Sequence, residues 1–317
     1  MKVLLTGAFG NVGKSAAEEI HKKGYDLKMF DIPTKANLKL SKKYKKYGEI
    51  FWGDLRDKAA VNEAVENVDV VVHVAAIIPP LADKKPDFAK SINVDGTANI
   101  VEAMEKNKRP SKIIYTSSIA VYGDRRKNPF IKVTDALNPN DDDEYAKQKI
   151  MAEKIIRDSK LSWTIFRLTY IVSPEKLEMD PLMFKMPLDT KIEICHTKDV
   201  GKALANAIEN DAIHGKTLNI AGGERCRISY KDYLDRMTEI FGLGKDFLPP
   251  EAFATSDFHC GYMDTEESQR LLNYQTLSLE DYFNEVKRKI GIKAPFATLF
   301  KHFIRKKLLN QSSYYKS

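Results

Sequence analysis

The chain has 317 residues, which is enough for one large or two modest domains, and its hydrophobic fraction of 43% allows a full core without covalent or metal cross-links. The three cysteines are far apart and odd in number, so we expect no disulfide framework, no metal and a reducing, cytoplasmic compartment. The net charge of +7 comes from cations mixed with acids along most of the chain, which does not indicate a nucleic-acid partner, and no apolar run approaches the ~20 residues of a membrane-spanning helix.

The first thirty residues read as a strand, a glycine-rich turn, a helix and a second strand that ends in an acid. Residues 2–6 predict a short buried strand, and a helical pattern runs from the turn to about residue 23. Residues 27–30 predict the second strand, which Asp31 follows. This succession is the context that a dinucleotide-binding fingerprint requires.

Glycines recur at every third position of the turn. Gly7 permits a sharp strand-to-helix turn, Gly10 allows the backbone to approach a pyrophosphate, and Gly13 allows the helix to pack close to the sheet. The helix N-terminus then offers N–H groups and the positive end of its dipole to the phosphates. The predicted phosphate-binding residues are Gly7, Phe9, Gly10, Asn11, Val12 and Gly13.

Asp31 distinguishes between the two nicotinamide cofactors. A carboxylate at the end of the second strand accepts hydrogen bonds from the adenine ribose hydroxyls and repels a 2′-phosphate. The residues after it bring no arginine, and Lys35 is the nearest cation. The sequence therefore favours NAD over NADP.

Strands and helices continue to alternate as far as residue 168. The predicted strands are 50–52, 68–74, 112–116 and 163–168, and the predicted helices are 58–66, 87–106 and 144–159. This alternation predicts an α/β fold, a Rossmann-type doubly wound parallel sheet with a smaller mixed C-terminal substrate lobe. We expect a dinucleotide-binding domain over 1–170, a substrate lobe over 171–293 and a basic amphipathic tail over 294–317, with the ligand cleft between the lobes.

Tyr145 and Lys149 are four residues apart on a predicted helix and therefore share one face. A free phenol has a pKa of about 10 and is a poor base at neutral pH. A nearby ammonium group favours the phenolate, so we expect Lys149 to lower the pKa of Tyr145. Tyr145 can then exchange a proton with a substrate hydroxyl or carbonyl during hydride transfer.

Three segments together resemble the extended short-chain dehydrogenase/reductases, the group of NAD-dependent epimerases, dehydratases and related reductases. They are the Gly-x-x-Gly-x-x-Gly turn, the Thr-Ser-Ser-Ile-Ala-Val-Tyr-Gly run at 116–123 and the Tyr-x-x-x-Lys pair at 145–149. The resemblance covers roughly residues 1–290. It implies that Ser118 is the catalytic hydroxyl, or Ser117 if the register shifts by one, and that Lys149 also holds the nicotinamide ribose. It further implies cofactor contacts or supports at Asp54, Leu55, Ala75, Ala76, Asn93 and Thr116.

The region after residue 169 departs from the sugar-nucleotide members of this group. Tyr170-Ile171-Val172-Ser173-Pro174 stands where those members usually carry an Asn-Val-Tyr-Gly-Pro-like run, and the segment 173–196 is short. The substrate therefore stays open between a nucleotide sugar and a smaller or more apolar carbonyl compound, and so does the choice between net reduction and an internal redox cycle. A non-catalytic NAD(P)-sensing regulator or scaffold of the same fold is the alternative, which an intact Ser118, Tyr145 and Lys149 disfavours.

The tail combines apolar residues at helical spacing with an excess of cations. Phe296, Leu299, Phe300, Phe303, Ile304 and Leu308 recur at steps of one helical face, and no acid occurs over 294–317. The helix either packs on its own body or a second subunit, as in a homodimer, or lies on an anionic membrane surface. We expect packing, because docked amphipathic helices are the commoner case.

Overall fold

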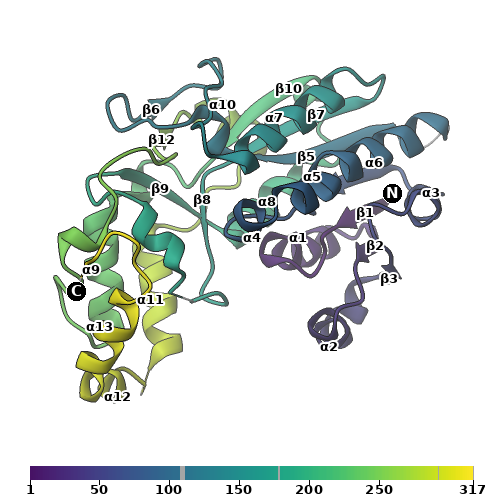
Figure 1. Cartoon of the computed structure of the whole chain (residues 1–317). Coiled ribbons are helices and arrows are strands. Elements are labelled where there is room, and N and C mark those ends of the chain that lie inside the picture. The colour runs from purple at the N-terminus through teal and green to yellow at the C-terminus, as the bar shows by residue number, and fades with distance from the viewer. Residues whose placement is uncertain (108–110, 178, 292, 317) are drawn as a thin grey trace.

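The computed structural model describes residues 1–107, 111–177, 179–291 and 293–316, and they form a large lobe around a parallel sheet and a smaller C-terminal lobe (Figure 1). The large sheet has seven strands in the order β10-β7-β5-β4-β1-β2-β3, all parallel to their neighbours. These strands are β1 (Lys2–Thr6), β2 (Asp26–Asp31), β3 (Glu49–Trp52), β4 (Val70–His73), β5 (Lys112–Ser118), β7 (Ser162–Leu168) and β10 (Lys216–Ile220). The predicted doubly wound α/β fold is confirmed.

Helices cover both faces of this sheet, which is why its central strands β1, β4 and β5 are almost entirely buried. α1 and α8 pack together on one face, and α3, α6 and α7 lie on the other (Figure 1). The helices of this lobe are α1 (Asn11–Lys22), α2 (Lys35–Tyr44), α3 (Lys58–Val65), α4 (Leu81–Lys84), α5 (Pro86–Asn93), α6 (Asp95–Lys106), α7 (Glu144–Arg157) and α8 (Thr197–Ala207). Short 3-10 helices are η1 (Lys45–Tyr47), η2 (Ile119–Tyr122), η3 (Pro181–Lys185), η4 (Asp211–Ile213), η5 (Glu224–Cys226) and η6 (Pro250–Ala252).

The segments 87–106 and 35–44 of the large lobe differ from the sequence expectation. The helix predicted over 87–106 is divided at Val94 into α5 and α6. The helix α2 was not predicted, because only Ser41 and Tyr44 of its ten residues are buried and the rest carry no strong apolar stripe. Thr34 starts α2 by accepting a hydrogen bond from the backbone N–H of Asn37.

The large sheet does not end at residue 170, where the sequence placed a domain boundary. After β8 (Tyr170–Val172) and β9 (Lys191–His196) the chain returns to the sheet, adding α8 to its helical layer and β10 to its edge beside β7. A Cβ at Gly201 of α8 would lie 2.6 Å from the Ser15 carbonyl oxygen, so only glycine allows this close approach to α1. Segments 197–220 therefore belong to the large lobe.

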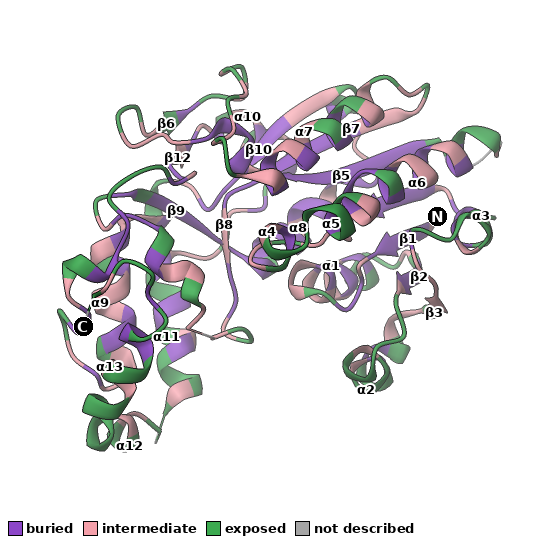
Figure 2. Cartoon of the chain, viewed as in Figure 1, coloured by how far each residue is buried: buried purple, intermediate pink, exposed green. Residues whose placement is uncertain are grey.

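The smaller lobe has its own apolar core, to which the sheet β11-β9-β8, α9 and α11 contribute (Figure 2). The two-stranded sheet that pairs β12 with β6 belongs to a separate small core, and Leu272 of α10 is buried in the core of the large lobe. The elements are β6 (Phe130–Ile131), β8 (Tyr170–Val172), β9 (Lys191–His196), β11 (Arg227–Ser229), β12 (Tyr262–Met263), α9 (Tyr230–Ile240), α10 (Glu266–Leu272) and α11 (Leu279–Ile290).

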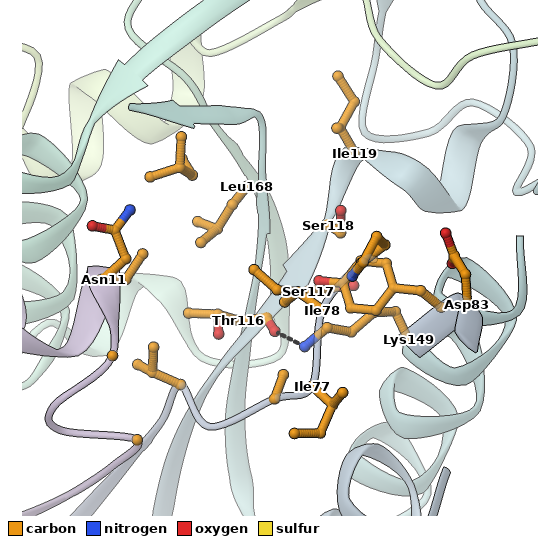
Figure 3. A pocket seen from close by; sticks show the side chains of 18 of the residues that line it. Asn11, Ile77, Ile78, Asp83, Thr116, Ser117, Ser118, Ile119, Lys149 and Leu168 are labelled. Carbon is orange, nitrogen blue, oxygen red and sulfur yellow. Dashed lines mark hydrogen bonds between the residues drawn. The ribbon is translucent and has the colours of Figure 1, made fainter. Parts of the chain in front are cut away.

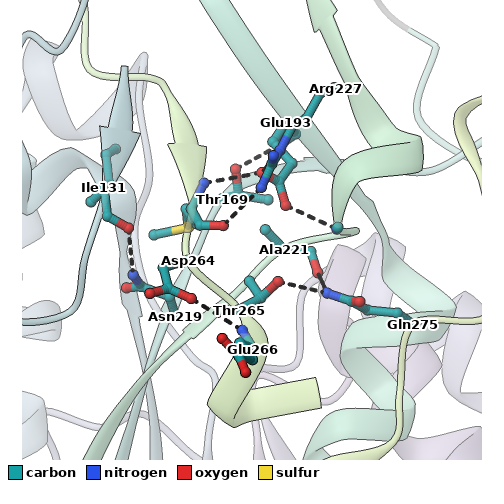
Figure 4. A network of polar contacts seen from close by, with 12 residues as sticks. Ile131, Thr169, Glu193, Asn219, Ala221, Arg227, Asp264, Thr265, Glu266 and Gln275 are labelled. Atoms are coloured by element: carbon teal, nitrogen blue, oxygen red, sulfur yellow. Dashed lines mark hydrogen bonds and ion pairs between the residues drawn. The ribbon is translucent and has the colours of Figure 1, made fainter. Parts of the chain in front are cut away.

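A buried carboxylate ties these small sheets together (Figure 4). Glu193 of β9 accepts hydrogen bonds from the backbone N–H groups of Gly223 (2.9 Å) and Met263 (3.0 Å) and forms an ion pair with Arg227 at 2.9 Å. Its own carbonyl accepts the Thr169 hydroxyl, which follows β7 of the large sheet. Burial raises the pKa of Glu193, and Arg227 opposes that shift. The network thus positions the smaller lobe against the edge of the large sheet.

The tail forms α12 (Lys293–Leu299) and α13 (Lys301–Leu309). Leu308 and Leu309 are buried in the core of the smaller lobe, and Ile304 packs against it. The expected packing on the protein's own body is therefore present, but only for this inner face. In the described ranges, no helix has the length and apolarity needed to cross a membrane.

Candidate active site

A cavity of about 1460 Å³ lies at the carboxyl ends of the sheet strands, between the two lobes. This is where open α/β sheets bind ligands, and the volume exceeds the ~300–1,000 Å³ of a typical single-ligand pocket. Of the predicted site residues, those that line it are Gly7, Phe9, Gly10, Asn11, Val12, Gly13, Asp31, Asp54, Leu55, Ala75, Ala76, Thr116, Ser118, Tyr145 and Lys149. The fold therefore brings nearly all of them to one surface.

The glycine-rich turn forms a cradle that side chains would fill. Gly7 has φ +66°, and a Cβ there would lie 2.7 Å from the Ala75 Cα. A Cβ on Gly13 would lie 2.0 Å from the Gly7 carbonyl oxygen, so the start of α1 can approach β1 only without a side chain. Gly10 is the N-cap of α1 and provides no capping side chain. The first turn of α1 is thus open to an anion, as a pyrophosphate requires.

Phe9 contributes its backbone to the cavity and its ring to the core. The ring packs against Trp52 and Tyr44, with centroid distances of 5.4 and 6.1 Å. The Phe9 N–H donates a 2.8 Å hydrogen bond to the Asp31 carboxylate. Asp31 therefore fixes the shape of the glycine-rich turn in addition to facing the cavity.

The Asp31 carboxylate also accepts hydrogen bonds from the Ile32 N–H at 2.8 Å and the Asn37 side chain at 3.2 Å. Burial raises its pKa above the ordinary value, although the hydrogen bonds from Phe9 and Ile32 act in the opposite direction. A buried acceptor at the end of β2 suits ribose hydroxyls, and it opposes a second negative charge at the same place.

We expect Asp31→Asn to narrow the preference for NAD(H) over NADP(H) by about tenfold or more, because one charge-assisted hydrogen bond contributes about 1.5–3 kcal/mol. The amide removes the charge but keeps an acceptor for the Phe9 N–H, so the turn should hold its shape. Calorimetric titration of both cofactors measures the effect, with Asp26→Asn at the exposed start of β2 as control. Tighter NADP(H) than NAD(H) binding by the unmodified protein would contradict the assignment.

The predicted adenine side is formed by Asp54 and Leu55. Arg56 binds the Asp54 carboxylate through two nitrogens, with its Nη2 at 2.6 Å, and this hydrogen bonding lowers the pKa of Asp54. Leu55 is buried against Gly96, where a Cβ would come within 2.8 Å of the leucine side chain. The Asp54 carboxylate is therefore ionised and fixed by Arg56, and Leu55 lines the cavity beside it.

Asn93 is the exception among the predicted cofactor residues, because it is absent from the described residues that line the cavity. Its side chain accepts from the Ile77 N–H (2.7 Å) and donates to the Ile77 carbonyl (2.9 Å) and to Gln148 (2.8 Å). Asn93 therefore supports the loop after β4, which itself lines the cavity.

Figure 3 shows Ser117, Ser118 and Lys149 around the end of β5, and Tyr145 lines the same cavity. Ser118 acts on the Tyr145 phenol in the direction that lowers its pKa, against the larger effect of burial. The buried Ser117 hydroxyl has no hydrogen-bond partner among the described residues. Of the two serines, Ser118 is therefore the one whose hydroxyl influences the Tyr145 pKa.

Lys149 lies beneath these groups, and its Nζ donates a 2.8 Å hydrogen bond to the Thr116 carbonyl (Figure 3). The same nitrogen is 4.8 Å from the Tyr115 ring centroid and 5.7 Å from that of Tyr145. Burial lowers the pKa of Lys149 to about 7. One layer deeper, His73 is a packed core residue between Thr6 and Thr97, and burial lowers its pKa to about 3.

The expected lowering of the Tyr145 pKa is wrong for the protein without ligands. Burial raises the pKa of Tyr145 well above 10, and the hydrogen bond from Ser118 only partly offsets it. The sequence argument failed because it ignored desolvation, which also removes much of the charge of Lys149 near neutral pH.

We expect the free energy of unfolding of the ligand-free protein to rise with pH between about 7 and 10.5 because of Lys149. In this range the lysine is protonated in the unfolded chain and increasingly neutral in the folded protein, so a rising pH favours the folded state. Lys149→Met should remove this contribution. Urea unfolding across that pH range measures it, with the exposed Lys154→Met on the same helix as control. Equal pH profiles for Lys149→Met and the unmodified protein would show that the ammonium is not penalised by burial.

The opposite wall of the cavity was not predicted from sequence. The loop 256–260 places His259 at 2.9 Å from Asp143, the N-cap of the helix that carries Tyr145. Tyr314 of the tail also lines the cavity. Acids predominate on this side; they are Asp83, Asp124, Asp141, Asp142, Asp143, Asp180 and Asp257. Of these acids, only the run of three aspartates at 141–143 stands out in the sequence. Acids at that position are explained equally well by their favourable interaction with the N-terminus of the following helix.

The fold and the glycine cradle define a dinucleotide-binding protein of the short-chain dehydrogenase/reductase superfamily. The model of the NAD dependent epimerase/dehydratase family matches residues 3–221, and the chain belongs to that family. The family description confirms the predicted cofactor, NAD, and the predicted class, an enzyme family.

Two curated relatives illustrate the similarity. The chain is 37% identical over 131 residues to the N-acetyl-alpha-D-glucosaminyl-diphospho-ditrans,octacis-undecaprenol 4-epimerase of Escherichia coli O157:H7, covering 38% of this chain and 36% of that protein. It is 32% identical over 159 residues to a UDP-glucose 4-epimerase of Lactobacillus helveticus, covering 49% of this chain and 46% of that protein. These matches span less than half the length of either relative.

Solved structures support the fold over nearly the whole chain. A UDP-glucuronic acid 4-epimerase from Bacillus cereus, in complex with UDP-glucuronic acid and NAD, superposes with a TM-score of 0.75 at 22% identity, covering 92% of this chain and 99% of that one. A short-chain dehydrogenase/reductase superfamily protein from Agrobacterium tumefaciens with bound NAD gives 0.73 at 16% identity, covering 96% and 100%. At 22% and 16% identity these superpositions establish the fold alone.

Proposed function

We propose that this protein is an NAD-dependent enzyme that oxidises and reduces a carbinol carbon of a sugar-type substrate, with Ser118, Tyr145 and Lys149 as its catalytic set. The observation that carries the proposal is that Ser118, Tyr145 and Lys149 line the same cavity as the glycine cradle, with Lys149 held by the Thr116 carbonyl. A proton-transfer group, an oxygen-binding hydroxyl and a cofactor site thus share one surface.

Each residue has a distinct task in this proposal. Tyr145 takes the proton from the substrate hydroxyl and returns it to the carbonyl oxygen in the reverse direction. Ser118 donates a hydrogen bond to that oxygen as charge develops on it. Lys149 is fixed by the Thr116 carbonyl and holds the nicotinamide ribose. NAD, bound along the turn and Asp31, supplies the hydride acceptor and donor.

The acidic wall supports a substrate rich in hydroxyl groups. Carboxylates accept hydrogen bonds and give none when ionised, so a lining dominated by Asp side chains matches donors on the ligand. Lys176 and Lys185 are cations on this wall, and Lys185 is 3.4 Å from Asp83. The named relatives are mostly sugar-nucleotide or sugar-lipid epimerases. Internal redox on such a sugar, as in epimerisation, is therefore our leading reaction.

A dehydrogenase acting on a smaller sugar acid is the second candidate. The connection from β8 to β9 is short, which leaves little chain to enclose a nucleotide. D-erythronate dehydrogenase of Cupriavidus necator is 26% identical over 170 residues, covering 50% of this chain and 50% of that protein.

A substrate panel tests the proposal. NAD-loaded protein is mixed with UDP-sugars and with free sugar acids, while the absorbance of reduced nicotinamide and the product composition by NMR are followed. Epimerisation gives a product without net NADH, whereas dehydrogenation gives NADH in proportion to product. NAD binding with no turnover of any sugar and no transient reduction would favour the regulator or scaffold of the same fold instead.

A further inference from the structure

The outer face of the tail carries an apolar patch that no described part of the protein covers. The patch consists of four large side chains that are mostly exposed: Phe296 (66%), Leu299 (76%), Phe300 (57%) and Phe303 (70%). Scattered exposed apolar residues are normal on soluble proteins, but four adjacent ones on one segment mark an interaction site.

The patch spans the junction between α12 and α13, two separate helices that meet at Phe300. The Phe300 N–H donates to the Ala297 carbonyl at 3.2 Å, and the Ile304 N–H donates to the Phe300 carbonyl at 3.0 Å. Phe296 and Leu299 are three residues apart on α12, and Phe300 and Phe303 are three residues apart at the start of α13, so each pair shares one side of its helix and the two pairs are adjacent in the chain at the junction.

The opposite face of the tail is fixed to the smaller lobe. The Thr298 hydroxyl donates to the Gly242 carbonyl at 2.6 Å, and Arg305 Nε donates to the Phe247 carbonyl at 2.8 Å. The Ser312 hydroxyl donates to the Ala252 carbonyl at 2.6 Å, beyond the buried Leu308 and Leu309. These hydrogen bonds and buried leucines fix the tail with the patch pointing outward. The face that packs on the smaller lobe is therefore a different face from the patch.

The patch lies at the outer end of the smaller lobe, far from the large sheet, where an extended surface can reach it (Figures 1 and 2). Exposed cations surround it: Lys293, Lys301, His302, Lys306 and Lys307 flank the apolar side chains in the chain. No acid occurs over 294–317. Apolar side chains in a purely cationic segment are typical of helices that lie in the headgroup region of an anionic bilayer.

We propose that this patch docks the protein peripherally on an anionic membrane surface, with the four apolar side chains entering the headgroup region and the lysines contacting lipid headgroups. A second copy of the chain fits less well. A two-fold symmetric contact would place this cationic segment against itself, and it contains no carboxylates to neutralise the charge. The anionic surface provides the complementary charge that a second copy lacks.

Vesicle co-sedimentation of the full chain tests this. The protein should bind vesicles of phosphatidylcholine mixed with phosphatidylglycerol, bind pure phosphatidylcholine much less, and release as salt rises. The double variant Phe300→Ser/Phe303→Ser should weaken binding to the anionic vesicles at least tenfold. The variant Lys301→Gln/Lys306→Gln/Lys307→Gln should weaken it by about fivefold per charge, since each nearby cation contributes about 1 kcal/mol.

Matched controls lie at the other end of the molecule, on α2, where the exposed side chains of Leu38, Lys39, Lys42 and Lys43 offer the same kinds of change. Leu38→Ser and Lys39→Gln/Lys42→Gln/Lys43→Gln should leave vesicle binding within about twofold of the unmodified protein. All variants must keep the unmodified melting temperature, which exposed positions permit.

Two results would overturn the proposal. One is equal binding of the unmodified protein to neutral and anionic vesicles, or to neither. The other is a concentration-dependent dimer, seen by analytical ultracentrifugation, that Phe300→Ser/Phe303→Ser dissociates while anionic vesicles bind neither form. These readouts require no catalytic activity, so they are independent of the proposed reaction.

Discussion

Replacing Tyr145 by phenylalanine should lower turnover by about 10²–10⁴-fold, the usual contribution of a proton-transfer group. The ring stays and only the hydroxyl, the group that would transfer the proton, is lost from the cavity lining. NAD affinity should stay within a few-fold, because the cradle and Asp31 are untouched. Calorimetry for NAD and single-turnover reduction of bound NAD by the active sugar separate the two effects.

The pH dependence gives a second readout for Tyr145. The base is the phenolate, and burial raises the pKa of Tyr145, so oxidation should accelerate as pH rises above neutrality. Tyr145→Phe should lose this rise together with the rate. Tyr262→Phe, a half-exposed tyrosine outside the cavity lining, is the matched control and should keep both. A phenylalanine variant that kept most of its activity would remove Tyr145 from the mechanism.

Gly13→Ala should abolish NAD binding and destabilise the protein by about 3 kcal/mol or more, at the upper end of the cost of overpacking. The added Cβ would lie 2.0 Å from the Gly7 carbonyl oxygen and 2.9 Å from the Ala8 Cα. Both contacts are backbone atoms, so no side chain can rotate away. The start of α1 must therefore move off the turn, and the N–H groups that face the phosphates move with it.

Gly24→Ala, just beyond the other end of α1, is the control for Gly13→Ala. Gly24 has φ +79° but nothing within 4 Å of an added Cβ, so it should cost only the ~1–2 kcal/mol of left-handed backbone and leave NAD binding intact. Gly10→Ala should separate the role of the turn in NAD binding from its role in stability. An added Cβ at Gly10 meets only the Gly7 oxygen, at 3.2 Å. It should weaken NAD binding with a small stability change. Titration with NAD measures the affinity, and urea unfolding measures the stability. Unchanged NAD affinity in Gly13→Ala would contradict the assignment of this turn as the phosphate-binding site.

The cofactor half of the protein was readable from the sequence because its signals are local. Strand, turn and helix follow one another within thirty residues, and the spacing of Gly7, Gly10 and Gly13 has one structural meaning in that setting. Tyr145 and Lys149 share a helix face by periodicity alone. These patterns predicted the fold class and the NAD preference expected from Asp31, and nearly all of the site residues that they predicted line the cavity.

Elements without a local signal were missed or misplaced. The helix α2 lacks an apolar stripe, and the return of α8 and β10 to the large sheet depends on pairing with β7 rather than on any feature of residues 197–220. The contact of His259 with Asp143 joins distant parts of the chain, which periodicity cannot reveal.

The sequence by itself determined the fold class, the family resemblance and the cofactor, since these depend on residue spacing within single elements. Only the tertiary structure decided which residues line the cavity, how burial shifts the pKa values of Tyr145 and Lys149, and which face of the tail is exposed. Burial is the physical reason: desolvation raises the pKa of Tyr145 and lowers that of Lys149 to about 7, whereas the side chains around Phe300 stay in water because no described part of the chain covers them. Burial depends on what long-range folding places around a side chain, and no short stretch of sequence contains that information.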